Sequence, residues 1–309
     1  MSYLKKNIII IGAGPAALSM SSTLLMANVD HIILEKSEKP GGQLTEIHNE
    51  PEDFIIGLYK NGLELTKKIN NFSNKYQFPI KFHSKVTGID IHTKTINYIH
   101  RGIEKHINYD YVIIATGSRF NIDKKSIDRR FSKDIYYRIS YNLNDFSNKK
   151  VAVIGNGDNA TIAALRLIDY ASEIYLVNKS DRWKSRKDLV DNVINHPKII
   201  VLNHKILIEL NGDTNLKSIE IKDINTGDKN SIKIDKIVYK IGYLPNSEFI
   251  PQEIDMDEKG YIKVTERYKT SAPNIFAIGD IVSSAYKRIS IALGHGTELG
   301  NFFLKELLE

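Results

Sequence analysis

The sequence predicts an α/β fold with two three-layer domains, and three observations support this prediction. The chain opens with a strand–helix–strand pattern over residues 7–35, and the same pattern returns over residues 150–178. In both copies an apolar run that is rich in β-branched residues precedes a glycine-rich turn and a helix-forming stretch. The chain has 309 residues, which is enough for two domains of ordinary size.

The first copy contains a glycine motif that suits a dinucleotide. Its strand, residues 8–11, ends at Gly12, and a helix-like stretch over residues 16–27 follows. Gly12 permits the tight turn, and Gly14 lets backbone N–H groups approach a pyrophosphate at the N-terminus of the helix. Ala17 keeps the helix close to the strand.

An acidic residue completes this first copy. The second apolar run, residues 31–34, stops at Glu35, which lies 23 residues after Gly12. A carboxylate at this place can accept hydrogen bonds from both hydroxyls of an adenosine ribose. This context favours a Rossmann-like dinucleotide site over a glycine turn in an ordinary α/β protein.

The second copy repeats the glycines but not the acid. The turn glycine, the second glycine and the alanine have counterparts in Gly155, Gly157 and Ala160. Asn178 takes the place of Glu35, since it also lies 23 residues after the first glycine of its copy. Two such motifs predict two bound dinucleotides, as a flavoprotein that is supplied by a nicotinamide cofactor requires.

Composition excludes several classes of site. The chain has no cysteine, so disulfides, thiolate nucleophiles and thiolate metal sites are absent. Its net charge of +6 is spread over the sequence, and no aromatic and basic residues interleave as in a nucleic-acid module. The apolar run at the N-terminus breaks at Gly12, and no stretch approaches the ~20 apolar residues that span a bilayer. We expect a cytoplasmic protein that binds neither metal, nucleic acid nor membrane.

The remaining pattern predicts further elements and one irregular segment. A helix is expected over residues 57–72 and another over residues 291–308. Short strands are expected over residues 80–82, 86–91, 94–100, 105–108, 111–115, 199–202, 216–222, 231–234, 236–241 and 273–279. Residues 119–148 are basic and irregular, which favours a solvated connection and leaves a docking face for an acidic partner as the alternative.

In this order the motifs resemble those of the low-molecular-weight thioredoxin reductases and the thioredoxin-reductase-like ferredoxin–NADP reductases. The resemblance covers nearly the whole chain. The motifs that carry it are Gly12-Ala-Gly14-Pro-Ala, Glu35, Gly41-Gly-Gln-Leu-Thr45, Ala115-Thr-Gly117, Gly155-x-Gly157-x-x-Ala160, Gly242-x-x-Pro245-Asn246 and Gly279-Asp280. It implies two Rossmann-like domains of the pyridine nucleotide-disulfide oxidoreductase class II type. Residues 1–117 and 245–309 would form the FAD-binding domain and residues 118–244 the NAD(P)-binding domain.

The resemblance also implies the cofactor-binding residues. Gln43 and Leu44 would lie along the flavin, and Asp280 would bind the ribityl chain. The full set implied for FAD is Gly12, Gly14, Pro15, Ala16, Glu35, Lys36, Gly42, Gln43, Leu44, Val86, Ala115, Thr116, Gly117, Gly279, Asp280, Lys287, Arg288 and Ile289, of which the last three would touch the isoalloxazine. The set implied for NAD(P) is Gly155, Gly157, Asp158, Asn159, Ala160 and Lys179.

Two departures from the family pattern limit the function. The family's Cys-x-x-Cys falls on Arg138-Ile-Ser-Tyr141, so this chain cannot pass two electrons to a disulfide through its own thiols. The His-Arg-Arg that selects NADPH is replaced by Asn178-Lys179-Ser180. One cation remains, and further cations follow at Arg182, Lys184 and Arg186.

In the ferredoxin-reductase relatives, an aromatic residue after the Gly-Gly-Gln-Leu segment stacks on the flavin. The matching position is near His48, with Phe54 as the alternative. A stacked or proton-donating His48 is the one catalytic candidate, and an ordinary loop histidine is the favoured interpretation.

The sequence therefore predicts an FAD-dependent oxidoreductase. NADPH, or NADH, would supply electrons through FAD to an external acceptor, most simply a ferredoxin or a flavodoxin. The alternatives are a small-molecule acceptor, or a flavin-binding sensor or scaffold without turnover. The resemblance further implies a homodimer.

Overall fold

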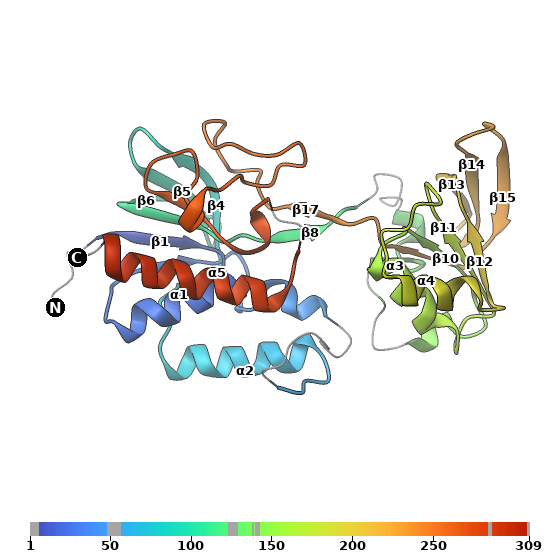
Figure 1. The fold of residues 1–309 in the computed structure, drawn as a ribbon, viewed down its shortest axis with the longest axis horizontal. Helices are drawn as coiled ribbons and strands as arrows, with labels where there is room; N and C mark the ends of the chain where they lie inside the picture. Colours follow the sequence, from blue (N-terminus) through green and yellow to red (C-terminus); the bar gives the residue numbers. More distant parts are fainter. Residues whose placement is uncertain are drawn as a thin grey trace. The chain divides into compact units, whose positions relative to one another are not determined.

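The structure is a computed structural model, which describes residues 6–47, 57–122, 129–137, 139, 143–283 and 286–307. The chain divides into two units (Figure 1). Unit 1 consists of residues 1–119 and 244–309, and unit 2 consists of residues 120–243. Each is described by itself.

Unit 1 is built on a five-stranded parallel sheet with the order β18-β7-β1-β2-β3. Its strands are β1 (Ile8–Ile11), β2 (Ile32–Leu34), β3 (Ile80–Lys81), β7 (Tyr111–Ile114) and β18 (Ile275–Ala277). The apolar runs are buried on both faces, as expected of a parallel sheet that is covered on both sides. The strands predicted over residues 8–11, 31–34 and 111–115 are confirmed to within one residue.

Strand alternation divides the core of unit 1 into two layers. Ile8 and Ile10 of β1 pack with the helices α1 (Pro15–Met26) and α5 (Ile289–Phe302). Ile9 and Ile11 pack on the other face with the antiparallel strands β4 (Ser84–Asp90) and β5 (Thr95–His100), and β6 (Ile103–Asn108) pairs with β5. Figure 1 shows the two helices and this second sheet on opposite sides of β1.

Helix α2 (Gly62–Lys75) begins later than its apolar pattern predicts. The sequence favours a helix from residue 57, but Asn61 is the N-cap and its Oδ1 accepts from Glu64 N at 3.0 Å. Glu64 Oε2 in turn accepts from Lys60 N at 2.9 Å. The first bond satisfies an N–H group that the helix leaves open, and the second ties Glu64 to the residue before the N-cap, so the two bonds fix where the helix begins. The predicted range over 57–61 is therefore wrong.

Unit 2 repeats the plan of unit 1. Its parallel sheet has the order β12-β11-β10-β16-β9. The strands are β9 (Ile135–Tyr136), β10 (Lys150–Ile154), β11 (Glu173–Val177), β12 (Ile199–Leu202) and β16 (Lys236–Tyr239). Val151 and Val153 face the helices α3 (Asp158–Leu167) and α4 (Lys187–Ile194). Ala152 and Ile154 face a three-stranded antiparallel sheet of β13 (Lys205–Gly212), β14 (Leu216–Asp223) and β15 (Lys229–Lys233).

The fold confirms the predicted α/β class with two parallel sheets, and it adds elements that the sequence did not predict. Helix α4 and strand β13 were not expected, because charged residues interrupt both stretches. The chain passes from one unit to the other in two segments, and these segments pair with each other as the strands β8 (Ser118–Phe120) and β17 (Tyr243–Pro245). Among the described residues, no helix combines the length and apolar character that a membrane crossing needs.

Candidate functional site: two nucleotide loops

In unit 1 the loop between β1 and α1 leaves room for a phosphate group. A Cβ built on Gly12 would lie 2.7 Å from the carbonyl oxygen of Ala115, so only glycine fits this turn. A Cβ on Gly14 would meet nothing within 4 Å. Helix α1 starts at Pro15 with no side-chain cap, which leaves the N–H groups of its first turn, including that of Ala16, available to an anion.

Glu35 is held rigidly at the end of β2. Its side chain is 7% exposed. One carboxylate oxygen accepts from Ala13 N at 2.7 Å, and the other accepts from Ser37 N at 2.7 Å. Each oxygen keeps capacity for a second donor, as recognition of a ribose diol requires. Lys36 follows as an exposed residue.

The Gly41–Leu44 turn lies directly on this loop. Gly41 N donates to Ala13 O at 2.8 Å, and a Cβ on Gly42 would lie 3.4 Å from the Cα of Gly14. Gln43 Nε2 donates to Ser118 Oγ at 2.9 Å and to Asp280 Oδ2 at 3.3 Å. The Gln43 side chain thus links sequence motifs that are more than two hundred residues apart. Leu44 is 2% exposed and packs in a small apolar cluster with Leu65, which makes it a support of the turn.

Two further family motifs fold against each other. Thr116 Oγ1 donates to Asn246 O at 2.9 Å, and Asn246 Nδ2 donates to Thr116 O at 2.8 Å. Asn246 N also donates to Gly117 O at 3.0 Å. These bonds fix the Ala115–Gly117 turn, which follows β7 at the same sheet edge as Gly12. The Pro245-Asn246 motif therefore serves the shape of this turn.

Asp280 lies in the short 3-10 helix η6 (Gly279–Ile281) that follows β18. Burial raises the pKa of its carboxyl, while Lys287 and the bond from Gln43 oppose that shift. Lys287 Nζ donates to Val282 O at 2.7 Å and lies 4.3 Å from the ring centre of Tyr261. Burial lowers the pKa of Lys287. A partly desolvated carboxylate is a strong acceptor for hydroxyl groups.

The other residues implied for FAD lie around these loops in different ways. Val86 is 8% exposed and its side chain belongs to the core beneath β4, so only its backbone could face a ligand. Arg288 is the N-cap of α5 and Ile289 is its first residue. Ile289 packs against the cluster that holds Leu44. The open Gly14 loop, Glu35 and the desolvated Asp280 fit a dinucleotide with a hydroxyl-rich chain, as FAD has.

The matching loop of unit 2 has the same construction. A Cβ on Gly155 would lie 2.3 Å from Lys240 O, whereas a Cβ on Gly157 would meet nothing within 4 Å. Helix α3 starts at Asp158 without a side-chain cap on its N-cap residue. Asn159 follows in its first turn, and Ala160 packs in the core. The loop is open to a pyrophosphate for the same reason as its counterpart.

The segment after β11 folds back onto this loop. Lys184 N donates to Asn156 O at 3.0 Å, and Asn156 Nδ2 donates to Arg182 O at 3.0 Å. The Asp158 carboxylate accepts from Arg186 N at 2.8 Å and from Ser185 Oγ at 3.0 Å. Asp158, the first residue of α3, therefore fixes the position of Ser185 and Arg186, a role that the sequence did not indicate.

Asn178 ends β11 at the place that corresponds to Glu35. It is fully buried, and its Nδ2 donates to Asn203 Oδ1 at 3.1 Å. Its Oδ1 has no donor among the residues that the structure describes. A buried acceptor without a donor is uncommon and suits a position that receives a ligand hydroxyl. The nicotinamide dinucleotide therefore also fits the residues present.

Cations near this loop differ in whether they are already paired. Arg186 lies 3.9 Å from Asp158 and 3.8 Å from Asp188, so its charge is partly neutralised. Within the described part of the chain, four exposed cations of the same segment pair with no carboxylate: Lys179, Arg182, Lys184 and Lys187. An anionic group could approach these four without displacing an internal partner.

The remaining predicted residues lie outside the described ranges. His48 and Phe54 belong to this group, as do Arg138, Ser140 and Tyr141. Ile139, between them in the sequence, is 4% exposed in the core of unit 2.

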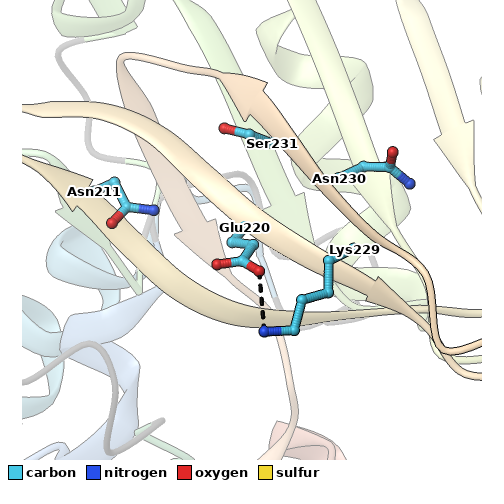
Figure 2. Close-up of a pocket in the computed structure, with 5 residues that line it drawn as sticks. All are labelled: Asn211, Glu220, Lys229, Asn230 and Ser231. Atoms are coloured by element: carbon cyan, nitrogen blue, oxygen red, sulfur yellow. Dashed lines mark ion pairs between the residues drawn. The ribbon is translucent and has the colours of Figure 1, made fainter.

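The described part of the chain has two further surface hollows, of which the second reaches Pro15 at the start of α1. One, of about 250 Å³, lies on the β13–β15 sheet, and Figure 2 shows its residues. Lys229 and Glu220 pair there at 3.3 Å, so this hollow offers no free charge. A second, of about 270 Å³, is largely apolar and is lined from α1, α2 and α5. No cluster of three or more His, Asp or Glu side chains that could hold a metal occurs in the ranges that the structure describes.

Comparison with known proteins agrees with this construction. The chain is 28% identical to a thioredoxin reductase of Borreliella burgdorferi over 96% of this chain and 92% of that protein. It is 27% identical to a ferredoxin–NADP reductase of Picrophilus torridus over 90% of this chain and 86% of that protein. The solved thioredoxin reductase of Lactococcus lactis has the same fold, with a TM-score of 0.85, 24% identity and coverage of 97% and 98%.

The family model described as pyridine nucleotide-disulphide oxidoreductase matches residues 6–296, which is most of the chain. Its match spans both glycine loops, the Ala115–Gly117 turn and the Gly279-Asp280 motif. The chain therefore belongs to the pyridine nucleotide-disulphide oxidoreductase family, and it is an NAD(P)H-dependent oxidoreductase that uses FAD.

Proposed function

We propose that this enzyme passes electrons from NADPH, through FAD, to an external one-electron carrier such as a ferredoxin or a flavodoxin. Unit 1 would hold FAD between the Gly12–Gly14 loop, Glu35 and Asp280. Unit 2 would hold the nicotinamide dinucleotide at the Gly155–Gly157 loop. FAD accepts a hydride and can release electrons one at a time, which is the conversion that such a carrier needs.

The observation that carries the proposal is the combination of two intact nucleotide loops with a chain that has no cysteine. A dithiol relay to thioredoxin requires two thiols near the flavin. Because this chain has none, electrons must leave to an acceptor that meets the flavin itself. The similarity to a ferredoxin–NADP reductase supports a protein carrier as that acceptor.

The chain's own residues would orient the cofactors and exclude competing contacts. The N–H groups at the start of α1 and α3 would bind the two pyrophosphates. Glu35 would accept from the ribose of FAD, and Asp280 from the ribityl hydroxyls. No side chain needs to transfer a proton in the hydride step.

Anaerobic titration with NADPH tests the first half of the reaction. The flavin absorbance near 450 nm should bleach with one equivalent of NADPH, as it does for reduced flavins in general. The single tryptophan, Trp183, lies in the segment that folds onto the Gly157 loop, so its fluorescence reports cofactor binding separately. A flavin that stays oxidised while Trp183 reports binding would favour the sensor or scaffold.

Steady-state reduction of cytochrome c through added carrier tests the second half. We expect turnover with a ferredoxin or flavodoxin, and none with thioredoxin when reduction of a disulfide substrate is followed instead of cytochrome c. With an acidic carrier the rate should fall steeply between 20 mM and 300 mM salt, because screening weakens attraction between exposed charges. A rate that ignores salt would point to a small neutral acceptor, such as a quinone.

The basic stretch that begins at Arg119 and the basic segment over residues 179–187 differ in how well they could attract such a carrier. Arg119 donates to Pro245 O at 2.8 Å and is ion-paired with Glu248, so its charge is already compensated. The unpaired cations around Lys187 are the better candidates. Lys187→Glu should raise the KM for an acidic carrier about threefold or more, as loss of a steering charge does. Lys233→Glu, an exposed charge change on β15, is the matched control.

We further propose that the enzyme is a homodimer, on the strength of the family resemblance. Light scattering on the purified holoprotein should give twice the mass of one chain. A monomeric mass at micromolar concentration would contradict this.

A further inference from the structure

We propose that His295 of α5 is a positioning residue for the FAD site, which holds the Gly279–Asp280 turn in place only while its imidazole is neutral. The inference rests on the proposed role of Asp280 in binding the ribityl chain. No family motif quoted above includes position 295.

The hydrogen bond from Gly279 defines the state of the imidazole. Gly279 N donates to His295 Nδ1 at 3.2 Å. A backbone N–H can only donate, so Nδ1 must carry a lone pair, and the proton of the neutral ring lies on Nε2. Protonation of Nδ1 would remove the acceptor and set two donors against each other.

The turn that receives this bond has little freedom to move. Gly279 has a φ of +74°, and a Cβ there would lie 2.9 Å from the Cβ of Ala16. Asp280 follows at once and is linked to Gln43 at 3.3 Å. A displacement of the Gly279 amide would therefore move Asp280 relative to Gly14 and to Ala16 in the first turn of α1.

The backbone of His295 is fixed by close helix packing. A Cβ on its neighbour Gly296 would lie 2.1 Å from Ala16 O, and a Cβ on Gly300 would lie 2.8 Å from Thr23 Cβ. Helices α5 and α1 lie side by side for this reason (Figure 1). The imidazole of His295 therefore lies on a helix that packs closely on α1, beside the loop proposed to bind the pyrophosphate.

The imidazole of His295 also packs against Tyr268, which belongs to a loop with an unusual backbone conformation. The rings of Tyr268 and His295 lie 4.7 Å apart, and Tyr268 OH donates to Glu298 Oε2 at 2.6 Å. Tyr268 and Arg267 both have left-handed backbones, with φ of +61° and +60°. Such residues need surrounding contacts to hold them, and Arg267 is ion-paired with Glu306.

The charges around His295 act in both directions. Burial lowers the pKa of the imidazole, Lys287 lowers it further, and Glu298 raises it. Asp280 lies just beyond Gly279, and Tyr268 stays neutral because burial and Glu298 raise its pKa. Since the folded pKa is depressed, the neutral acceptor prevails at pH 7 and above, and it is lost only when the pH falls through the folded pKa, which lies below the ordinary value of 6.5.

Release of FAD from the purified holoprotein, followed by flavin fluorescence, tests the proposal. In a series of pH values that descends from pH 8, the wild type should retain FAD about tenfold more weakly once the pH has fallen through the folded pKa of His295, since a buried donor then loses its partner. His295→Asn keeps an acceptor in the place of Nδ1 and cannot titrate, so its affinity should stay high throughout the series. His295→Leu should be about tenfold weaker throughout. His106→Leu, an exposed histidine on β6, is the control.

Amide exchange at Gly279 gives a readout that needs no flavin chemistry. Its protection should fall in His295→Leu and persist in His295→Asn. An unchanged FAD affinity in His295→Leu, or wild-type pH dependence in His295→Asn, would overturn the role of His295 even if NADPH still bleaches the flavin. A wild-type chain that binds no FAD would overturn this role together with the proposed function.

Discussion

The two nucleotide loops share one construction and differ at the residue that ends the second strand. In unit 1 this residue is Glu35, a carboxylate that is fixed by two backbone N–H groups. In unit 2 it is Asn178, a neutral carboxamide that is tied to Asn203. A carboxylate accepts from a ribose diol and repels a 2′-phosphate, whereas a carboxamide does not repel it. Under the proposed function, the glycines set where each dinucleotide binds, and the residue at the strand end sets which dinucleotide is accepted.

The largest effect should follow from filling the open glycine of each loop. A side chain at Gly14 or Gly157 meets no protein atom near its Cβ, and both residues have negative φ, so each variant should fold. Gly14→Leu should yield a colourless protein, because the side chain would occupy the place proposed for the FAD pyrophosphate. Gly157→Leu should stay yellow and fail to bleach with NADPH.

Absorbance of the two purified variants and anaerobic NADPH titration measure this pair. Circular dichroism checks that each is folded. A yellow Gly14→Leu, or a Gly157→Leu that NADPH still bleaches, would break the assignment of one cofactor to each loop.

A smaller effect is expected at Lys179, which follows the strand end of unit 2 and has no carboxylate partner among the described residues. A hydrogen bond to a charged group contributes roughly 1.5–3 kcal/mol, so Lys179→Ala should raise the KM for NADPH about tenfold. The KM for NADH should stay nearly unchanged, because NADH lacks the 2′-phosphate. Wild-type enzyme should prefer NADPH moderately.

Steady-state kinetics with both cofactors measure this preference, and Lys233→Ala controls for the loss of one positive charge in unit 2. Equal losses with NADPH and NADH would show that Lys179 does not contact the 2′-phosphate. A wild-type preference for NADH would exclude the proposal outright.

Asn178→Asp would make the second loop resemble the first. Asn203 can turn its carboxamide to donate to the new carboxylate, and the remaining oxygen would accept from a ribose hydroxyl. The ratio of kcat/KM for NADH to that for NADPH should rise about fivefold or more, because the carboxylate repels the 2′-phosphate. An unchanged ratio would show that the strand end does not select the cofactor. Asn203→Ala is the control, because it removes only the hydrogen-bond partner of residue 178.

Sequence alone was informative where a residue acts through its own place in a motif. The glycines, Glu35 and the strands around them follow from spacing and apolar runs. It was uninformative where a residue acts through distant contacts. The bond from Gln43 to Asp280 spans 237 positions. Asp158 accepts hydrogen bonds from residues 185 and 186, and His295 accepts one from Gly279. No local sequence pattern indicates these contacts. Such contacts depend on tertiary packing, which a single sequence does not display.

Unit 1 contains a buried polar pair that unit 2 lacks, and the smallest expected effect is the effect of this pair on stability. In unit 1, Ser21 is fully buried and its Oγ lies 2.7 Å from Nε2 of His31, whose Nδ1 lies 2.9 Å from Val29 O. The carbonyl must accept, so Nδ1 carries the proton and Nε2 accepts from the Ser21 hydroxyl. Counting from the first glycine of each copy, unit 2 has Ala164 and Ile174 at these positions, both fully buried.

Acid should therefore weaken unit 1 through His31. Burial lowers the pKa of His31 below its usual 6.5, so the folded state holds it neutral while the unfolded chain takes up a proton. The contribution of His31 to stability is complete above pH 6.5 and falls as the pH drops below it.

Ser21→Ala with His31→Ile copies the apolar pair of unit 2, and replacing both partners should nearly preserve stability at pH 8. His31→Ile alone leaves the Ser21 hydroxyl buried without its partner and should cost about 1–3 kcal/mol. Thermal melts followed by flavin release, from pH 8 to pH 5, measure the slope. If the double variant loses stability with acid as steeply as the wild type, the acid sensitivity of unit 1 resides in another group.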